Sequence, residues 1–168
     1  DHVAHVGHPR VVERIAHPRQ VGLGQMGRRC AQRLGALGFN LLGWRRGPTE
    51  VVGVNCSHGP ERLDRVLQAA DIVVVLLPLT GQTINLMDEA AFNAMRPGGY
   101  VINCSRGELV VDADLIAALD GGRLAGATLD AFREEPLPPG SNLWRHPKVR
   151  VTPHIASLSA PDTAALIL

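Results

Sequence analysis

Four polar side chains with acid–base or anion-binding chemistry follow apolar stretches in the second half of the chain. Arg106 comes after residues 100–104, Asp130 and Glu135 come after residues 124–129, and His154 comes after residues 149–151. In a parallel α/β sheet, ligands bind beyond the carboxyl ends of the strands. If these stretches are strands, a guanidinium, two carboxylates and an imidazole converge in one crevice. Such a set can bind an anion and move a proton.

A glycine-rich turn precedes these residues. Gly22, Gly24 and Gly27 have the spacing of a dinucleotide-binding turn, with Gln25 and Met26 between the last two glycines. The first glycine permits a tight turn, the second lets the backbone approach a pyrophosphate, and the third lets the following helix pack closely. The free N–H groups at the start of that helix favour phosphate. We therefore expect a nucleotide site here.

The segment before the turn is a poor buried strand, because residues 17–20 read His-Pro-Arg-Gln. We expect residues 1–20 to be irregular, and the first strand either to end at residues 21–23 or to be incomplete. His2, His5 and His8 lie in this segment, but Gly7 and Pro9 interrupt any helix that would align them, so a metal site is not favoured.

Two arginines, Arg45 and Arg46, stand about 20 residues after the glycine turn, where an NAD-specific fold has an acidic residue. Arginine suits a 2′-phosphate both by charge and by bidentate geometry. The sequence therefore favours NADP(H), with NAD(H) as the alternative. Two arginines on a solvated surface are the plainer interpretation, which leaves the missing acid unexplained.

The rest of the chain alternates strand-like and helix-like segments. Helices are predicted at residues 25–37, 60–69, 88–95 and 112–120, the last capped by Asp112. Strands are predicted at residues 39–44, 51–54, 71–77, 100–104, 124–129 and 149–151. This alternation predicts a doubly wound, Rossmann-like parallel sheet of the α/β class. Residues 21–168 form one dinucleotide-binding domain in this interpretation.

The composition is that of an ordinary globular domain, with 45% hydrophobic and 20% charged residues among 168. The net charge of +1 gives no reason to expect nucleic acid as a partner. The longest apolar run, residues 72–77, is too short for a membrane span, and the first residues do not read as a signal peptide. Three cysteines without a CxxC pair favour a reducing compartment. We expect a cytoplasmic protein.

Several stretches together resemble the D-isomer-specific 2-hydroxyacid dehydrogenases. They are GLGQMG, VVVLLPLT, PGGYVINCSRGELVVDADLIAALDGG and LAGATLDAFREEPLPPGSNLWRHPKVRVTPHIA. The phrases EPLPPGSNLW and HPKVRVTPHIA, with the arginines after Trp44, look most similar to the glyoxylate/hydroxypyruvate reductase branch.

The resemblance implies a role for each site residue. Arg106 would hold the substrate carboxylate and polarise the 2-keto oxygen, and His154 would donate a proton to that oxygen. Glu135 would bind the other imidazole nitrogen and fix its tautomer. Asp130 would bind the nicotinamide carboxamide. The cofactor would be lined by Leu77, Pro78 and Thr83.

Members of the family are about twice this length and carry a separate substrate domain, which we do not expect within these 168 residues. We therefore expect the cofactor-binding part of an NADPH-dependent reductase of small 2-keto acids, with weak or no turnover by itself. The alternative is a dinucleotide-binding module without catalysis. Apolar surface that the substrate domain covers in other members of the family would favour a homodimer.

Overall fold

The computed structural model describes residues 18–156. The expectations for His2, His5 and His8, and for residues 1–17 in general, lie outside that range. Among the helices of the described range, none has the length and apolar character that a membrane crossing requires.

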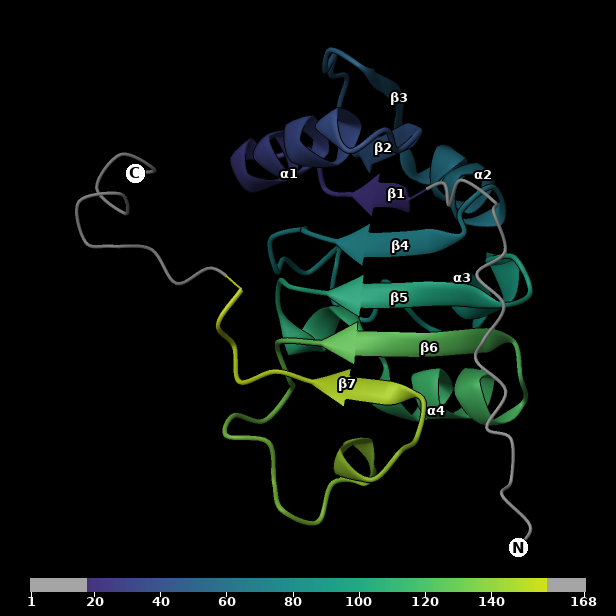
Figure 1. Ribbon diagram of the computed structural model, residues 1–168, viewed down its shortest axis with the longest axis vertical. Helices are drawn as coiled ribbons and strands as arrows, with labels where there is room; N and C mark the ends of the chain where they lie inside the picture. Colours follow the sequence, from purple (N-terminus) through teal and green to yellow (C-terminus); the bar gives the residue numbers. More distant parts are fainter. Residues whose placement is uncertain (1–17, 157–168) are drawn as a thin grey trace, which may run out of the picture.

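A single seven-stranded sheet organises the described chain (Figure 1). All its strand pairs are parallel, and its order is β3-β2-β1-β4-β5-β6-β7. This is the doubly wound order with one further strand, so the predicted fold class is confirmed. The strands are β1 (Pro18–Val21), β2 (Leu41–Arg45), β3 (Val54–His58), β4 (Ile72–Val75), β5 (Gly99–Asn103), β6 (Leu124–Leu129) and β7 (Val149–Val151).

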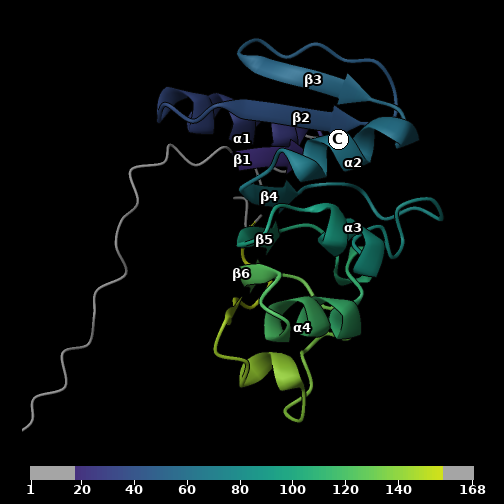
Figure 2. The ribbon, with the colours of Figure 1, turned by 90° about the vertical axis from the view of Figure 1, so that its right-hand side faces the viewer.

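The α-helices cover the sheet in the connections between strands. They are α1 (Gln25–Ala36), α2 (Leu63–Gln68), α3 (Glu89–Ala94) and α4 (Asp112–Asp120). Helix α3 contacts both α2 and α4, and Figure 2 shows α3 and α4 together on one side of the sheet. Because the β1-to-β2 connection runs the opposite way along the sheet, right-handed crossovers place α1 on the other face. Three short 3₁₀ turns complete the connections: η1 (Pro60–Arg62), η2 (Gly107–Leu109) and η3 (Asn142–Trp144).

The first strand differs from its prediction. Residues 18–20 belong to β1 and are not irregular, and Gly22 and Leu23 follow the strand. Each residue of β1 is paired with a residue of β4, from Pro18 with Ile72 to Val21 with Val75, so the strand spans its neighbour completely. Proline lacks a ladder N–H but is tolerated as the first residue of a strand. Pairing with β2 and β4 on both sides forms this strand although residues 17–20 have the sequence of a poor buried strand.

Other boundaries also move. The strand predicted at residues 51–54 is instead β3, which begins at Val54, while Val51 makes only an antiparallel bridge to Val54. The helix predicted at residues 60–69 is a 3₁₀ turn followed by α2. Asp112 is the first residue of α4 rather than its cap, which is Val111. Elsewhere the predicted helices and strands differ from the observed ones by at most two residues at either end.

The core lies between the sheet and the layer of α2, α3 and α4. Val73 and Val75 of β4 and Val101 of β5 are fully buried, as are Phe92 of α3 and Leu115 of α4. These side chains belong to one continuous apolar cluster. The cluster fixes the strand ends from which the site residues project.

Candidate functional site

The glycine turn lies where the order of strands reverses. Strand β1 runs between β2 and β4, so the turn at its carboxyl end faces the crevice between the loops that follow those two strands. Gly22 has a φ of 114°, and its N–H donates to the Trp44 carbonyl at 2.9 Å. A Cβ on Gly22 would lie 2.4 Å from the carbonyl oxygen of Leu76. Only glycine fits this position.

Gly24 and the start of α1 leave room for a ligand. A Cβ on Gly24 would meet no heavy atom within 4 Å. Gly24 is the N-cap of α1, has no capping side chain, and is followed by a first turn without acidic residues. The N–H groups of that turn therefore face an open space that suits an anion. Gly27 is buried, as the close packing of helix on sheet requires.

A long cleft extends from this turn in both directions. One section has a volume of about 540 Å³ and is lined by Gly22, Leu23, Gly24, Arg45, Arg46, Gly47, Leu76, Leu77, Pro78, Gln82 and Thr83. The next, of about 550 Å³, is lined by Gly24, Gln25, Met26, Gly27, Leu76, Leu77, Pro78, Leu79, Cys104, Ser105 and Arg106. The sections share Gly24 and residues 76–78, so they are continuous. The cleft brings together every predicted cofactor residue except Asp130.

The arginine end of the cleft is supported by a buried tryptophan. Trp44 is 2% exposed, and its Nε1 donates to the Gly59 carbonyl at 2.8 Å, which fixes the end of β2. Arg45 is half-buried, and Arg46 is exposed and bonds the side chain of Gln82 across the cleft. Arg28 of α1 donates to Thr49 Oγ1 at 2.8 Å and so ties the loop after β2 to that helix.

Thr83 shapes the cleft without offering its hydroxyl to it. The side chain is 1% exposed, and Oγ1 donates to the Pro78 carbonyl at 2.7 Å and accepts from the Thr80 N–H at 2.8 Å. Leu77 is buried and Pro78 is exposed in the same loop. This loop forms one wall of the cleft between the glycine turn and Gln82.

At the other end of the cleft, Arg106 stands on a turn built by Asn103. Asn103 is fully buried at the end of β5, where its Nδ2 donates to the Arg106 carbonyl at 2.9 Å and its Oδ1 accepts from the Ser105 N–H at 3.1 Å. The Arg106 guanidinium is exposed and donates to the Ser105 carbonyl at 2.8 Å. Its remaining donors can bind an anion. Sequence reasoning missed Asn103, although a polar residue ending an apolar strand is a usable signal.

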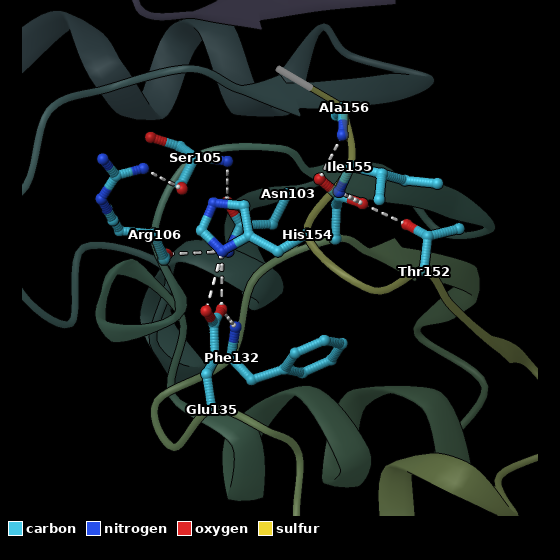
Figure 3. A network of polar contacts seen from close by, with 10 residues as sticks. Asn103, Ser105, Arg106, Phe132, Glu135, Thr152, His154, Ile155 and Ala156 are labelled. Atoms are coloured by element: carbon cyan, nitrogen blue, oxygen red, sulfur yellow. Dashed lines mark hydrogen bonds and ion pairs between the residues drawn. The ribbon is translucent and has the colours of Figure 1, made fainter. Parts of the chain in front are cut away.

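His154 and Glu135 form a close pair beside Arg106 (Figure 3). Nδ1 of His154 lies 2.8 Å and 3.0 Å from the two carboxylate oxygens of Glu135. Glu135 Oε1 also accepts from the Phe132 N–H at 2.9 Å. Hydrogen bonds from His154 and from the Phe132 N–H, with the charges of His154 and Arg106, hold the pKa of Glu135 below its ordinary value. Because Glu135 occupies Nδ1, the other ring nitrogen, Nε2, is the one that can exchange a proton with a ligand.

Asp130 follows β6 and lies beside the loop that carries His154. Its carboxylate is 2% exposed and accepts hydrogen bonds from Thr152, Ile155 and Ala156, and it does not line the cleft. Burial opposes its ionisation, but these bonds and the charge of His154 outweigh burial and lower its pKa. A direct contact of Asp130 with a nicotinamide stays a prediction.

Neither a disulfide nor a cluster of metal-ligating side chains is found near this site among residues 18–156, where all three cysteines are unpaired. Burial, and then the negative charge of Asp130, raise the pKa of the Cys104 thiol at the cleft, which disfavours a thiolate nucleophile. The arrangement can bind a long anionic ligand, hold a small acid at Arg106, and move a proton at His154.

Comparison with known proteins decides the family. Residues 20–156 match the model for the NAD-binding domain of the D-isomer specific 2-hydroxyacid dehydrogenases. The chain belongs to the D-isomer specific 2-hydroxyacid dehydrogenase family. Glyoxylate/hydroxypyruvate reductase A of Serratia proteamaculans is 42% identical over 144 residues, which cover 86% of this chain and 46% of that protein. The counterpart from Salmonella typhi is 43% identical over the same shares.

Solved structures of this family share the fold. A D-isomer specific 2-hydroxyacid dehydrogenase from Xanthobacter autotrophicus Py2, in complex with NADPH and MES, matches with a TM-score of 0.88 and 44% identity. The match covers 97% of this chain and 67% of that one. An NADPH-dependent glyoxylate/hydroxypyruvate reductase from Sinorhizobium meliloti, in complex with NADP and sulfate, matches with a TM-score of 0.83 and 37% identity over 91% and 49% of the chains. The chain thus spans about half the length of the curated relatives it matches.

Proposed function

We propose that this domain binds NADP(H) along the carboxyl edge of its sheet and takes part in reducing a small 2-keto acid, of the glyoxylate or hydroxypyruvate type, to the 2-hydroxy acid. One observation carries the proposal: the cleft that starts at Arg45 and Arg46 ends at Arg106, beside the paired His154 and Glu135. The names of the relatives, glyoxylate/hydroxypyruvate reductases, support the substrate class.

The residues of the cleft fit such a cofactor. The open space at Gly24 and the uncapped start of α1 suit a pyrophosphate. Arg45 and Arg46 provide positive charge for a 2′-phosphate, and no acidic side chain lines this section to favour a ribose hydroxyl instead. Leu77, Pro78 and Thr83 form the wall between these two points. The related structures from Xanthobacter autotrophicus Py2 and Sinorhizobium meliloti contain NADPH and NADP, respectively.

When bound, the reduced nicotinamide supplies a hydride to the keto carbon of the substrate. Arg106 binds the substrate carboxylate and stabilises the negative charge that develops on the keto oxygen. His154 donates a proton from Nε2 to that oxygen, so the product is the neutral hydroxyl. Glu135 holds the tautomer and the orientation of the imidazole through Nδ1. General acid catalysis of this kind contributes about 10²–10⁴-fold in rate.

This domain supplies only part of the complete reductase. Closure of a second domain over the nicotinamide excludes water and completes the substrate pocket in enzymes that work in this way. We therefore infer that the region equivalent to the unmatched half of the relatives provides the rest of the pocket, and that the described residues alone turn over slowly or not at all. Location in the cytoplasm and assembly as a homodimer stay predictions.

The second candidate function is a dinucleotide-binding module without catalysis. The open space at Gly24 and the uncapped start of α1 would serve such a module as well as an enzyme. In that case the cleft binds the dinucleotide, and the pair of His154 and Glu135 transfers no proton.

A two-step titration followed by NMR tests the proposal. NADP⁺ is added first, and we expect shifts at residues 22–27, 45–47 and 76–83. Oxalate, a stable mimic of a 2-keto acid, is then added, and we expect further shifts at Arg106 and His154. Shifts with NADP⁺ but none with oxalate would favour the non-catalytic module. Cofactor shifts confined to other regions would contradict both functions.

A further inference from the structure

The backbone at His154 adopts a conformation that residues other than glycine rarely take. Its φ is 53°, in the left-handed region that favours glycine. Its N–H donates to the Thr152 carbonyl at 3.0 Å, which closes a tight three-residue turn around Pro153. Strained residues of this kind persist only where the surrounding structure holds them in place. The loop therefore needs a group that fixes both sides of His154.

The carboxylate of Asp130 is that group. Its Oδ1 accepts from Thr152 Oγ1 at 2.5 Å and from the Ile155 N–H at 3.0 Å, and its Oδ2 accepts from the Ala156 N–H at 2.8 Å. These donors come from the chain before and after His154, as the contacts around Thr152, Ile155 and Ala156 show in Figure 3. The buried Asp130 carboxylate thus holds the loop by hydrogen bonds on both sides of His154.

The sheet holds Asp130 itself in place. Leu129 of β6 is paired with Val151 of β7, and the Thr152 N–H donates to the Leu129 carbonyl at 3.0 Å. The Asp130 N–H donates to the Asn103 carbonyl at 2.9 Å, at the start of the turn that carries Arg106. The conformation of the His154 loop is therefore built on the same strand ends as Arg106.

We propose that Thr152, acting through Asp130, is a positioning residue that holds His154 in its left-handed conformation and keeps its imidazole against Glu135. The Thr152 hydroxyl provides the only side-chain hydrogen bond that the structure records to this carboxylate within residues 18–156. The other two bonds come from the backbone N–H groups of Ile155 and Ala156, which no side-chain substitution removes. A substitution of Thr152 therefore alters the contacts between Asp130 and the loop without changing Asp130 or His154. The functional importance of these contacts rests on the proposed role of His154 as proton donor.

The test compares three variants of the full chain. Thr152→Val removes the hydroxyl and keeps the shape of the side chain nearly constant, whereas Thr152→Ser keeps the hydroxyl. The matched control is Thr128→Val, which removes another half-buried threonine hydroxyl, bonded to the Tyr100 hydroxyl at 2.9 Å in the same sheet. Hydrogen exchange at the Ile155 and Ala156 amides is measured by NMR, together with the pH titration of the Glu135 carboxyl carbon.

In Thr152→Val we expect exchange at Ile155 and Ala156 to become about fivefold faster, the equivalent of one ordinary hydrogen bond. We also expect the pKa of Glu135 to rise toward its ordinary value, because the bond from His154 is the largest cause of its lowering. Thr152→Ser should behave like the unchanged chain. The proposal is overturned if Thr152→Val changes neither quantity, or if Thr128→Val changes both equally. Neither measurement needs cofactor or turnover, so failure here is distinguishable from failure of the proposed function.

Discussion

At the scale of single residues, the pairing of His154 with Glu135 determines how the site responds to acid. The pKa of Glu135 lies below its ordinary value, so the carboxylate keeps its charge at pH values where an isolated glutamate begins to take up a proton. The contribution of the pair to folding is therefore present above the ordinary pKa of glutamate and is lost as the pH falls through the lowered pKa.

Replacing His154 tests this coupling. Asparagine tolerates the left-handed backbone, so His154→Asn removes the imidazole at small cost to the turn. We expect the pKa of Glu135, followed by carbon NMR, to rise toward its ordinary value. His146→Asn is the matched control, because His146 pairs with Asp120 elsewhere. An unchanged Glu135 titration in His154→Asn would show that the pair does not form in solution.

A second prediction concerns Arg106. Its guanidinium is exposed, so Arg106→Gln should leave folding intact. Charge-assisted, bidentate bonds to carboxylate are about twice as strong as neutral ones, so we expect oxalate to bind the NADP⁺-loaded chain at least about tenfold more weakly. Calorimetry measures the affinity, with Arg150→Gln, an exposed arginine on β7, as control. Equal losses in the two variants would mean that Arg106 contributes only general positive charge.

The sequence was sufficient to bring Arg106, Glu135 and His154 together, because each follows a strand whose apolar character is strong. It was not sufficient for Asn103 and Thr152, whose roles depend on contacts between neighbouring strand ends. Asp130 was placed at the same edge of the sheet, and the nicotinamide contact that the resemblance implies stays a prediction; its buried carboxylate also bonds the loop of His154. Such roles depend on the register of β6 against β7, which no local pattern encodes.

At the scale of elements, two glycines of the turn have different roles: Gly22 is needed for the stability of the fold, and Gly24 is needed for binding of the cofactor. Gly24→Ala should cost at most about 1 kcal/mol, the difference between glycine and alanine at an N-cap, because an added Cβ meets nothing within 4 Å and the φ of −71° suits alanine. The same Cβ would stand where a pyrophosphate approaches, so we expect loss of NADPH affinity. Gly22→Ala should instead destabilise the fold by about 1–3 kcal/mol or more, because its Cβ overlaps Leu76 and its φ is positive. Urea unfolding and NADPH titration of both variants make the comparison, and reversed outcomes would contradict it.

The sequence patterns predicted α4, β6 and β7 with their exact bounds, although β7 is an edge strand of half-exposed side chains. The bounds of α1, β4 and β5 differ from their predictions by one or two residues. β1 was misplaced because pairing with β2 and β4 imposes its conformation. β3 was misplaced because an edge strand with half-exposed side chains needs no apolar run.

At the scale of the whole molecule, its carboxylates predict acid sensitivity. Asp130 and Glu135 both have lowered pKa values in the folded state, so each stabilises the fold above its ordinary pKa and ceases to do so as the pH falls through the lowered value. Glu135 is more than one third exposed, so solvent screening leaves Asp130 the larger effect. We expect the free energy of unfolding, from urea titrations, to fall as the pH is lowered from about 5 to 3. A rise would mean that groups such as Asp112, whose pKa burial raises, outweigh them.

We propose that Arg45 and Arg46, at one end of the cleft, bind the 2′-phosphate of NADP(H). The most direct measurement is a calorimetric titration of the full chain with NADPH and with NADH, repeated with the Arg45→Ala/Arg46→Ala variant. We predict tighter binding of NADPH, and a loss in the variant of about tenfold or more for NADPH with little change for NADH. Equal affinity for the two cofactors, or equal losses in the variant, would contradict the claim.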